Sequence, residues 1–248
     1  MSNDVAQTVL IVGATSDIAR AIAREYARLG LRLQLAARNG ENLHADAEDL
    51  SLRHGASVSV HELEATALET FDAFADSLVP LPDVVVCAVG LLGDQTADQR
   101  DVAAECRVMQ VNYVGPACLL GVFAERFEKR GRGTIVGIGS VAGDRGRAKN
   151  YIYGSAKAGF AAYLSGLRNR LCSKGIQVLT VKPGFVATRM TSGMDMPSAL
   201  TQRPEALAQR IVKAQRSGKD VIYGDMWWAL IMAVIRGLPE KVFKRLDI

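Results

Sequence analysis

Short apolar segments rich in β-branched residues alternate with helical segments along most of this chain, which limits the folds that it can adopt. Strands separated by helices join most readily as parallel neighbours in one sheet, with the helices packed on its faces. We therefore predict an α/β fold, a doubly wound parallel sheet with helices on both faces, as a single domain over residues 1–248. The expected strands are Thr8–Val12, Leu31–Ala36, Ala56–Leu63, Val84–Ala88, Gly133–Ser140 and Gln177–Val181. The expected helices are Arg20–Leu29, Leu43–His54, Thr66–Leu78, Asp101–Phe127 with a break near Tyr113, and Tyr153–Ser173.

Composition and charge exclude several classes of protein. The formal net charge is +4 without a dense run of lysine and arginine, so we predict no nucleic-acid partner. The four cysteines form no CxxC pair and the three histidines do not cluster, so we predict no metal site. No apolar run reaches the roughly 18 residues of a transmembrane helix, and the polar start has no signal-peptide pattern. These features predict a cytoplasmic protein.

The segment from Gly13 to Ala19 joins the first strand to the first helix, where dinucleotide-binding chains hold a pyrophosphate. Backbone N–H groups of such a turn approach the phosphates, and the helix N-terminus favours their charge. Only one of three expected glycines is present, because Asp17 and Ala19 occupy the other two positions. A carboxylate there is unfavourable unless it points away from the phosphates, and Asp17 is alternatively a helix cap. The predicted cofactor contacts in this turn are Gly13, Thr15, Ser16, Asp17 and Ile18.

The end of the second strand indicates the cofactor. An acidic residue there would bind the ribose hydroxyl of NAD, but the sequence has Ala36-Ala37-Arg38-Asn39. Arg38 is suited to a 2′-phosphate, so NADP is preferred over NAD, although Arg38 is alternatively a solvated surface residue. At the end of the third strand, Glu62 and Leu63 are expected beside the adenine.

Further cofactor contacts follow the later strands. Ala88 and Gly90 come after the fourth strand, where glycine permits a close approach of the backbone to a ligand. The segment that begins with Pro183 follows the sixth strand and is expected to reach the cofactor amide. Its predicted contacts are Pro183, Gly184, Val186 and Thr188.

Three side chains near the fifth strand carry the expected chemistry. Tyr153 and Lys157 are four positions apart, so a helix would place them on one face. A lysine cation near the phenol would lower the tyrosine pKa from about 10, which suits a proton donor to a carbonyl oxygen. Ser140 would hold the same oxygen. A Tyr-x-x-x-Lys pair also occurs by chance on exposed helices, so its significance depends on the rest of the chain.

Asn112 lies just before the break in the long helical segment. Its side-chain amide would hold a water or a backbone group in a proton path, or would simply support a kink.

The order and spacing of Gly13, Asn112, Ser140, Tyr153-x-x-x-Lys157 and Pro183-Gly184 resemble the short-chain dehydrogenase/reductase family over nearly the whole chain. The resemblance implies a Rossmann fold, a nicotinamide cofactor and a homo-oligomer. It implies Tyr153 as acid/base, Lys157 as modulator of its pKa, Ser140 as the group that orients the carbonyl, and Asn112 in the proton relay. Tyr153 and Lys157 would also contact the cofactor. Asp17, Ala19 and the segment Cys87–Gly90 depart from the family pattern.

A narrower resemblance is to family members that reduce a keto sugar carried on a polyprenyl phosphate, with a flavin oxidase as partner. It rests on the motifs Gly90–Asp94, Gly143–Arg147, Tyr151–Lys157 and Arg236–Leu246. The tail, residues 226–248, joins the apolar run Trp227–Ile235 to four basic residues, which fits a peripheral membrane contact, an isoprenoid chain, or a buried dimer or core helix.

The resulting hypothesis is an NAD(P)H-dependent ketone reductase, with a keto sugar on a polyprenyl phosphate as the specific substrate and a segment at about 189–205 that covers it. Peripheral attachment at the inner face of the membrane is the matching localisation. Two alternatives remain at this stage: a reductase of a small apolar ketone, and a nucleotide-binding regulator that has lost turnover.

Overall fold

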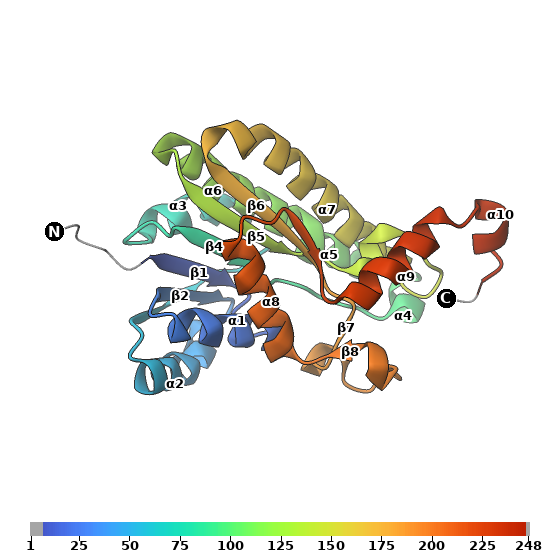
Figure 1. Ribbon diagram of the computed structural model, residues 1–248, viewed down its shortest axis with the longest axis horizontal. Helices are drawn as coiled ribbons and strands as arrows, with labels where there is room; N and C mark the ends of the chain where they lie inside the picture. The colour runs from blue at the N-terminus through green and yellow to red at the C-terminus, as the bar shows by residue number, and fades with distance from the viewer. Residues whose placement is uncertain (1–6, 247–248) are drawn as a thin grey trace.

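The computed structural model describes residues 7–246 and contains one large parallel sheet between two layers of helices (Figure 1). Its seven strands have the order β3-β2-β1-β4-β5-β6-β9, and each neighbouring pair is parallel. The strands are β1 (Thr8–Val12), β2 (Arg32–Ala37), β3 (Val58–Glu62), β4 (Val84–Cys87), β5 (Gly133–Ile138), β6 (Ile176–Lys182) and β9 (Val221–Tyr223). A second, two-stranded sheet pairs β7 (Phe185–Val186) with β8 (Thr201–Gln202). The predicted α/β Rossmann-like fold is confirmed.

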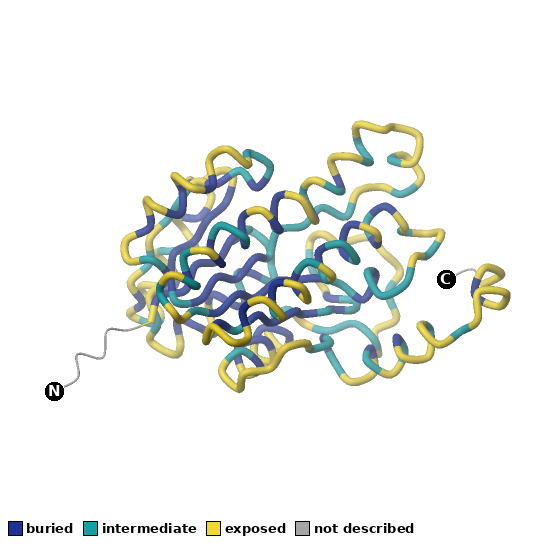
Figure 2. The backbone as a smooth tube through the Cα atoms, turned by 90° about the horizontal axis from the view of Figure 1, so that it is seen from above, coloured by how far each residue is buried: buried dark blue, intermediate teal, exposed yellow. Residues whose placement is uncertain are grey.

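Helices cover both faces of the sheet, and Figure 2 shows buried backbone concentrated between them. The longer ones are α1 (Asp17–Arg28), α2 (His44–His54), α3 (Phe71–Ser77), α5 (Val102–Met109), α6 (Gly115–Arg130), α7 (Tyr151–Leu171), α8 (Pro204–Arg216) and α9 (Met226–Gly237), and the short ones are α4 (Gln95–Asp98) and α10 (Glu240–Phe243). One hydrophobic core joins α1, α2 and α8 to the sheet, and the other joins α3, α6 and α7 to the opposite face. Burial on both faces explains why the central strands are uniformly apolar.

Several predicted boundaries were wrong by a few residues. The strand expected to include Ser140 ends at Ile138, α3 begins at Phe71 rather than Thr66, and α7 begins at Tyr151 rather than Tyr153. The break in the long helical segment is a π-helical turn, Gln110–Val114, followed by Pro116 in the first turn of α6. Proline lacks the N–H that would continue the helical bonds, which is the physical reason for a break here.

The C-terminal elements were not predicted as helix and strand. Strand β9 is only three residues long and gives a weak sequence signal, whereas α8 begins at Pro204 and is followed by Gly218 with φ of 69°, boundary signals that our sequence prediction did not use. Helix α9 lies at one end of the molecule, and α10 extends beyond it (Figure 1). A small third hydrophobic cluster, Val141, Trp228 and Met232, attaches α9 to the body.

Candidate active site

Two adjoining cavities follow the carboxyl ends of the central strands. One has a volume of about 280 Å³ and the other about 180 Å³, and Ser16, Ala88, Val89 and Gly90 line both. In open parallel sheets, ligands bind outside the carboxyl ends of the strands, where the chain connections diverge. The two cavities share four lining residues and form a single cleft at the position where a dinucleotide binds in such sheets.

The larger cavity brings together Ser140, Tyr153 and Lys157. The last two lie one turn apart on α7, as predicted, and Lys157 is only 3% exposed. The Lys157 Nζ donates hydrogen bonds to the backbone oxygens of Ile138 at 3.1 Å and Val89 at 3.4 Å. An ammonium group has three N–H donors, so one remains for a ligand in the cavity.

The predicted lowering of the Tyr153 pKa was wrong for the free protein. Burial raises the pKa of Tyr153 to about 12, and a hydrogen bond with the Ser140 hydroxyl acts in the opposite direction. Burial also lowers the pKa of Lys157 to about 8, which weakens the positive charge that was expected to stabilise the phenolate. The ammonium lies 5.7 Å from the centroid of the Tyr153 ring. Removal from water disfavours both charged forms and outweighs their mutual attraction.

Ser140 lies between two structural anchors. Its Oγ accepts a hydrogen bond from the Ala142 N–H at 3.1 Å, which caps the short helix Val141–Asp144. The Val141 N–H donates to the Pro183 carbonyl at 2.9 Å. The serine is thus fixed between the ends of β5 and β6, with its hydroxyl on the cavity.

Asn112 is fully buried in the π-helical turn and uses its whole side chain on backbone groups. Its Oδ1 accepts from the Leu91 N–H at 3.1 Å, and its Nδ2 donates to the Leu91 carbonyl at 2.6 Å and the Val108 carbonyl at 2.9 Å. Asn112 therefore holds the segment after β4 in place next to Lys157.

The turn after β1 retains the one glycine that it needs. Gly13 has φ of 77°, and a Cβ added there would lie 2.9 Å from the Ala88 carbonyl carbon. Ser16 is the N-cap of α1, and its Oγ accepts from the Ala19 N–H at 3.2 Å. The alternative that Asp17 caps this helix was wrong. The Asp17 carboxylate instead binds Arg189, from a segment 172 residues away.

Four of the predicted contacts line the smaller cavity: Gly13, Thr15, Arg38 and Leu63. The Arg38 side chain is 69% exposed, and its Nε lies 3.9 Å from a Glu64 carboxylate oxygen. Glu62, the last residue of β3, does not line the cavity, whereas Glu64 does.

The end of the cleft near Tyr153 contains the remaining predicted contacts. Asp17, Ile18, Pro183, Gly184, Val186 and Thr188 all line the larger cavity. A Cβ added to Gly184 would lie 2.0 Å from the Trp228 indole, so α9 packs directly on this loop. Val89, Arg107, Arg189 and Met190 also line the cleft but were not among the predicted cofactor contacts, although Arg189 and Met190 fall within the expected covering segment. Arg189 also had a local signal, because it follows Thr188 directly.

The site fits a nicotinamide dinucleotide. A Cβ added to Gly90 would lie 3.4 Å from the Asn112 Oδ1 and 3.7 Å from the Lys157 Nζ, so the glycine leaves a space in front of the lysine. Pyrophosphate groups bind at helix N-termini, and α1 presents its N-terminus with Ser16 on both cavities. Thr15, Ser16 and Ile18 would hold the phosphates, and Lys157 the ribose next to the nicotinamide.

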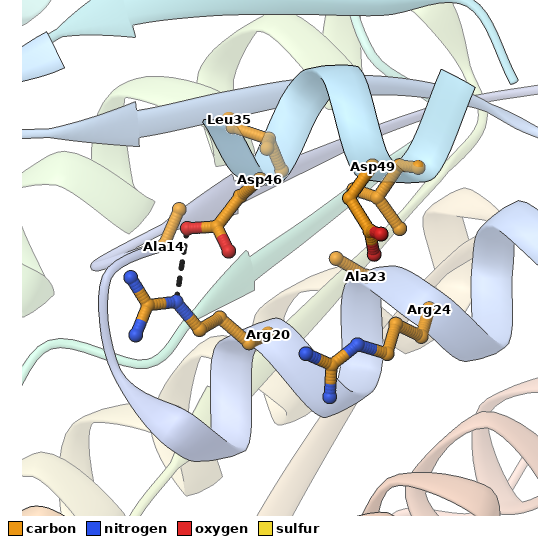
Figure 3. Close-up of a pocket in the computed structure, with 8 residues that line it drawn as sticks. Ala14, Arg20, Ala23, Arg24, Leu35, Asp46 and Asp49 are labelled. Carbon is orange, nitrogen blue, oxygen red and sulfur yellow. Dashed lines mark hydrogen bonds and ion pairs between the residues drawn. The ribbon is translucent and has the colours of Figure 1, made fainter. Parts of the chain in front are cut away.

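A separate hollow lies between α1 and α2 (Figure 3). Arg20 Nε and an Asp46 carboxylate oxygen are 2.9 Å apart there, and the volume is about 10 Å³. That is room for about one water molecule, so this hollow is a structural contact between helices.

Across residues 7–246, no three or more histidine, cysteine or acidic side chains gather as metal ligands would. None of the helices in this range is long and apolar enough to cross a membrane.

Comparison with known proteins gives consistent matches. The family model described as short chain dehydrogenase matches residues 7–197. An uncharacterized oxidoreductase of Mycobacterium tuberculosis (strain ATCC 25618 / H37Rv) is 36% identical over 99% of this chain and 99% of its own length. An uncharacterized oxidoreductase of Streptomyces coelicolor is 34% identical over 97% of this chain and 96% of its own length. The solved structure of a short-chain dehydrogenase from Sphingobium yanoikuyae in complex with NADPH has a TM-score of 0.81 at 25% identity, covering 94% of this chain and 97% of that one.

Proposed function

The chain belongs to the short-chain dehydrogenase/reductase family, and from this premise we propose that it reduces the ketone of a keto sugar carried on a polyprenyl phosphate. The class of the enzyme is an NAD(P)-dependent oxidoreductase. The more specific substrate follows from a resemblance to decaprenylphosphoryl-2-keto-ribose reductase in the motifs around Gly90, Arg145, Tyr153 and Arg236.

In the proposed reaction, Ser140, Tyr153 and Lys157 together deliver one proton to the carbonyl oxygen of the substrate. The nicotinamide supplies the hydride when it is bound. Ser140 donates a hydrogen bond to the substrate carbonyl oxygen, and Tyr153 transfers its proton to that oxygen as negative charge develops. Lys157 holds the ribose and, as a cation, stabilises the phenolate that remains. The high pKa of Tyr153 keeps the phenol protonated, and therefore able to donate, before reduction begins.

The observation that carries the lipid-linked substrate is the exposed face of α9. Met226, Trp227, Leu230 and Val234 are 77%, 66%, 57% and 59% exposed and share one side of the helix. The opposite side packs through Trp228 on Gly184 and Phe185 at the site. Exposed apolar surface of this kind beside basic residues suits a membrane interface. A peripheral contact there would place the cleft next to a substrate that is anchored in the lipid.

The basic loop after Ser140 supplies a phosphate ligand in this proposal. Arg145 already has structural partners within the protein. Its guanidinium donates to the carbonyls of Ile235 and Leu238, both at 2.6 Å, and stacks on the Phe243 ring. Arg147 is different: its Nε is buried and has no hydrogen-bond partner within residues 7–246. A substrate phosphate would satisfy it. The keto sugar must itself arise by oxidation of a hydroxyl, and we propose a flavin oxidase partner for that step.

We also propose NADP as the preferred cofactor and a homo-oligomer as the working form. Arg38 supports the first proposal, since its largely exposed guanidinium lines the smaller cavity where an adenosine 2′-phosphate would lie. The relative from Sphingobium yanoikuyae carries NADPH. In a fluorescence titration, Arg38→Ala should weaken NADPH binding by about tenfold and leave NADH binding unchanged.

A small apolar ketone is the second candidate, because Ile138, Val186 and Met190 give the larger cavity an apolar lining. The deciding experiment follows NADPH oxidation with a polyprenyl-phosphate keto sugar in anionic vesicles and, separately, with a water-soluble apolar ketone. The proposal expects turnover with the lipid-linked sugar that falls in Arg147→Gln. Faster turnover with the small ketone, unaffected by Arg147→Gln, would favour the second candidate.

A further inference from the structure

One ion pair joins the two walls of the larger cavity. The Arg189 backbone N–H donates to one oxygen of the Asp17 carboxylate at 2.7 Å, and its Nε donates to the other at 3.0 Å. Its Nη2 donates to the Thr15 carbonyl at 2.5 Å. These contacts connect the turn after β1 to the segment after β7, so two distant parts of the chain meet over the cleft.

The pair lies on the outer side of the cavity. Both residues line it, yet the Arg189 side chain is 66% exposed and the Asp17 side chain 24% exposed. The next residue, Met190, also reaches across, because its Cε lies 3.7 Å from a Cβ added to Gly90. The start of the covering segment therefore contacts the end of β1 and the end of β4 at once.

Charge explains why an acidic residue is tolerated in the turn. Asp17 is the first residue of α1, next to the place where a pyrophosphate binds in this fold. An isolated carboxylate would repel the phosphates. Arg189 neutralises it and binds both of its oxygens.

We propose that Asp17 and Arg189 form a clasp over the cofactor cleft, which opens to admit the cofactor and closes again over it. An exposed ion pair contributes little stability, so the clasp opens readily. If the clasp closes to the same extent over the empty and the occupied cleft, the open fraction multiplies the association rate constant. The same open fraction multiplies the dissociation rate constant. The clasp thus slows cofactor exchange in both directions and changes the affinity much less.

The test measures NADPH association and dissociation by stopped-flow fluorescence, without any ketone. The variants are Asp17→Asn, Arg189→Gln and the double variant. The matched control is Arg53→Gln, which breaks an exposed ion pair with Asp49 on α2, away from the cleft. Each single variant should raise both rate constants by up to about fivefold, which corresponds to one exposed ion pair. The double variant should equal the singles, and the control should equal the wild type.

Two results would overturn the clasp. If Arg189→Gln speeds dissociation alone while Asp17→Asn slows it, Arg189 is a direct phosphate ligand that Asp17 opposes. If neither rate constant changes in either variant, the pair has no effect on exchange. Since the measurement needs no substrate, its outcome is independent of whether the enzyme acts on a lipid-linked sugar.

Discussion

The proposed catalytic groups and the proposed covering region, residues 189–203 and 226–246, are held in place by different means, whereas α8 and β9 between these segments belong to the main core and the large sheet. Lys157 and Asn112 are 3% and 0% exposed and bind backbone groups of neighbouring strands and turns. They lie beside the two large cores. The covering region is attached to the rest of the molecule by β8, the Asp17–Arg189 ion pair, the three-residue cluster around Trp228 and the hydrogen bonds of Arg145 to the Ile235 and Leu238 carbonyls. Much of the rest of α9 is exposed.

This difference suggests that the proton-transfer groups and the entrance to the cleft have different mechanical requirements. A proton donor and its hydrogen-bond partners must keep their geometry to within fractions of an ångström, and packing on a closed core provides that rigidity. A region that must admit a cofactor and a substrate needs contacts that open at low cost, and local opening occurs where buried contacts are few. We therefore expect the rest of the molecule (the body) to determine which reaction occurs, and the covering region to determine which molecules reach the cleft.

The largest expected effect lies in the body. Tyr153→Phe removes the proton donor without creating a cavity, so kcat should fall roughly 10³-fold while NADPH still binds. Steady-state kinetics and a cofactor titration measure the two quantities separately. Tyr151→Phe is the matched control, since that hydroxyl lies two residues away on an exposed part of α7, and it should retain wild-type kcat. An equal loss in both variants would mean that Tyr153 has no special role.

The sequence predicted the body better than the covering region. The glycine turn, the strand ends and the Ser140–Tyr153–Lys157 spacing follow from local pattern, and each of these residues lines the cleft. The direction of the Tyr153 pKa did not follow, because burial depends on how several segments pack. The contact between Asp17 and Arg189 joins residues 172 apart, and spacing along one chain contains no information on such a pair. Glu62 was chosen where Glu64 lines the cavity, because the sequence pattern does not show which residue near the end of a strand faces the cleft.

Two cavity-creating variants test whether the two regions unfold separately. Phe160→Ala in the core under α7 should lower the global free energy of unfolding by about 4 kcal/mol, measured by chemical denaturation. Trp228→Ala should lower the local stability of α9 by about 3 kcal/mol, measured by hydrogen exchange, with little change in the global value. Trp227→Ala is the control, because its side chain is 66% exposed. A global loss in Trp228→Ala as large as that in Phe160→Ala would remove the distinction between the regions.

The smallest expected effect concerns the buried lysine. Burial lowers the pKa of Lys157 to about 8, so the group is a cation below that pH and neutral above it. Only the cation attracts an anionic cofactor, and NADPH affinity should fall by up to about tenfold from pH 7 to pH 9. The neighbouring groups do not titrate in this range, since burial raises the pKa of Tyr153 to about 12 and that of Cys87 to about 11. In Lys157→Met the affinity should be lower and independent of pH over the same range. A wild-type affinity that stays constant from pH 7 to pH 9 would show that the lysine keeps its charge despite its burial, and the rigid body would then hold a permanent cation beside the phenol.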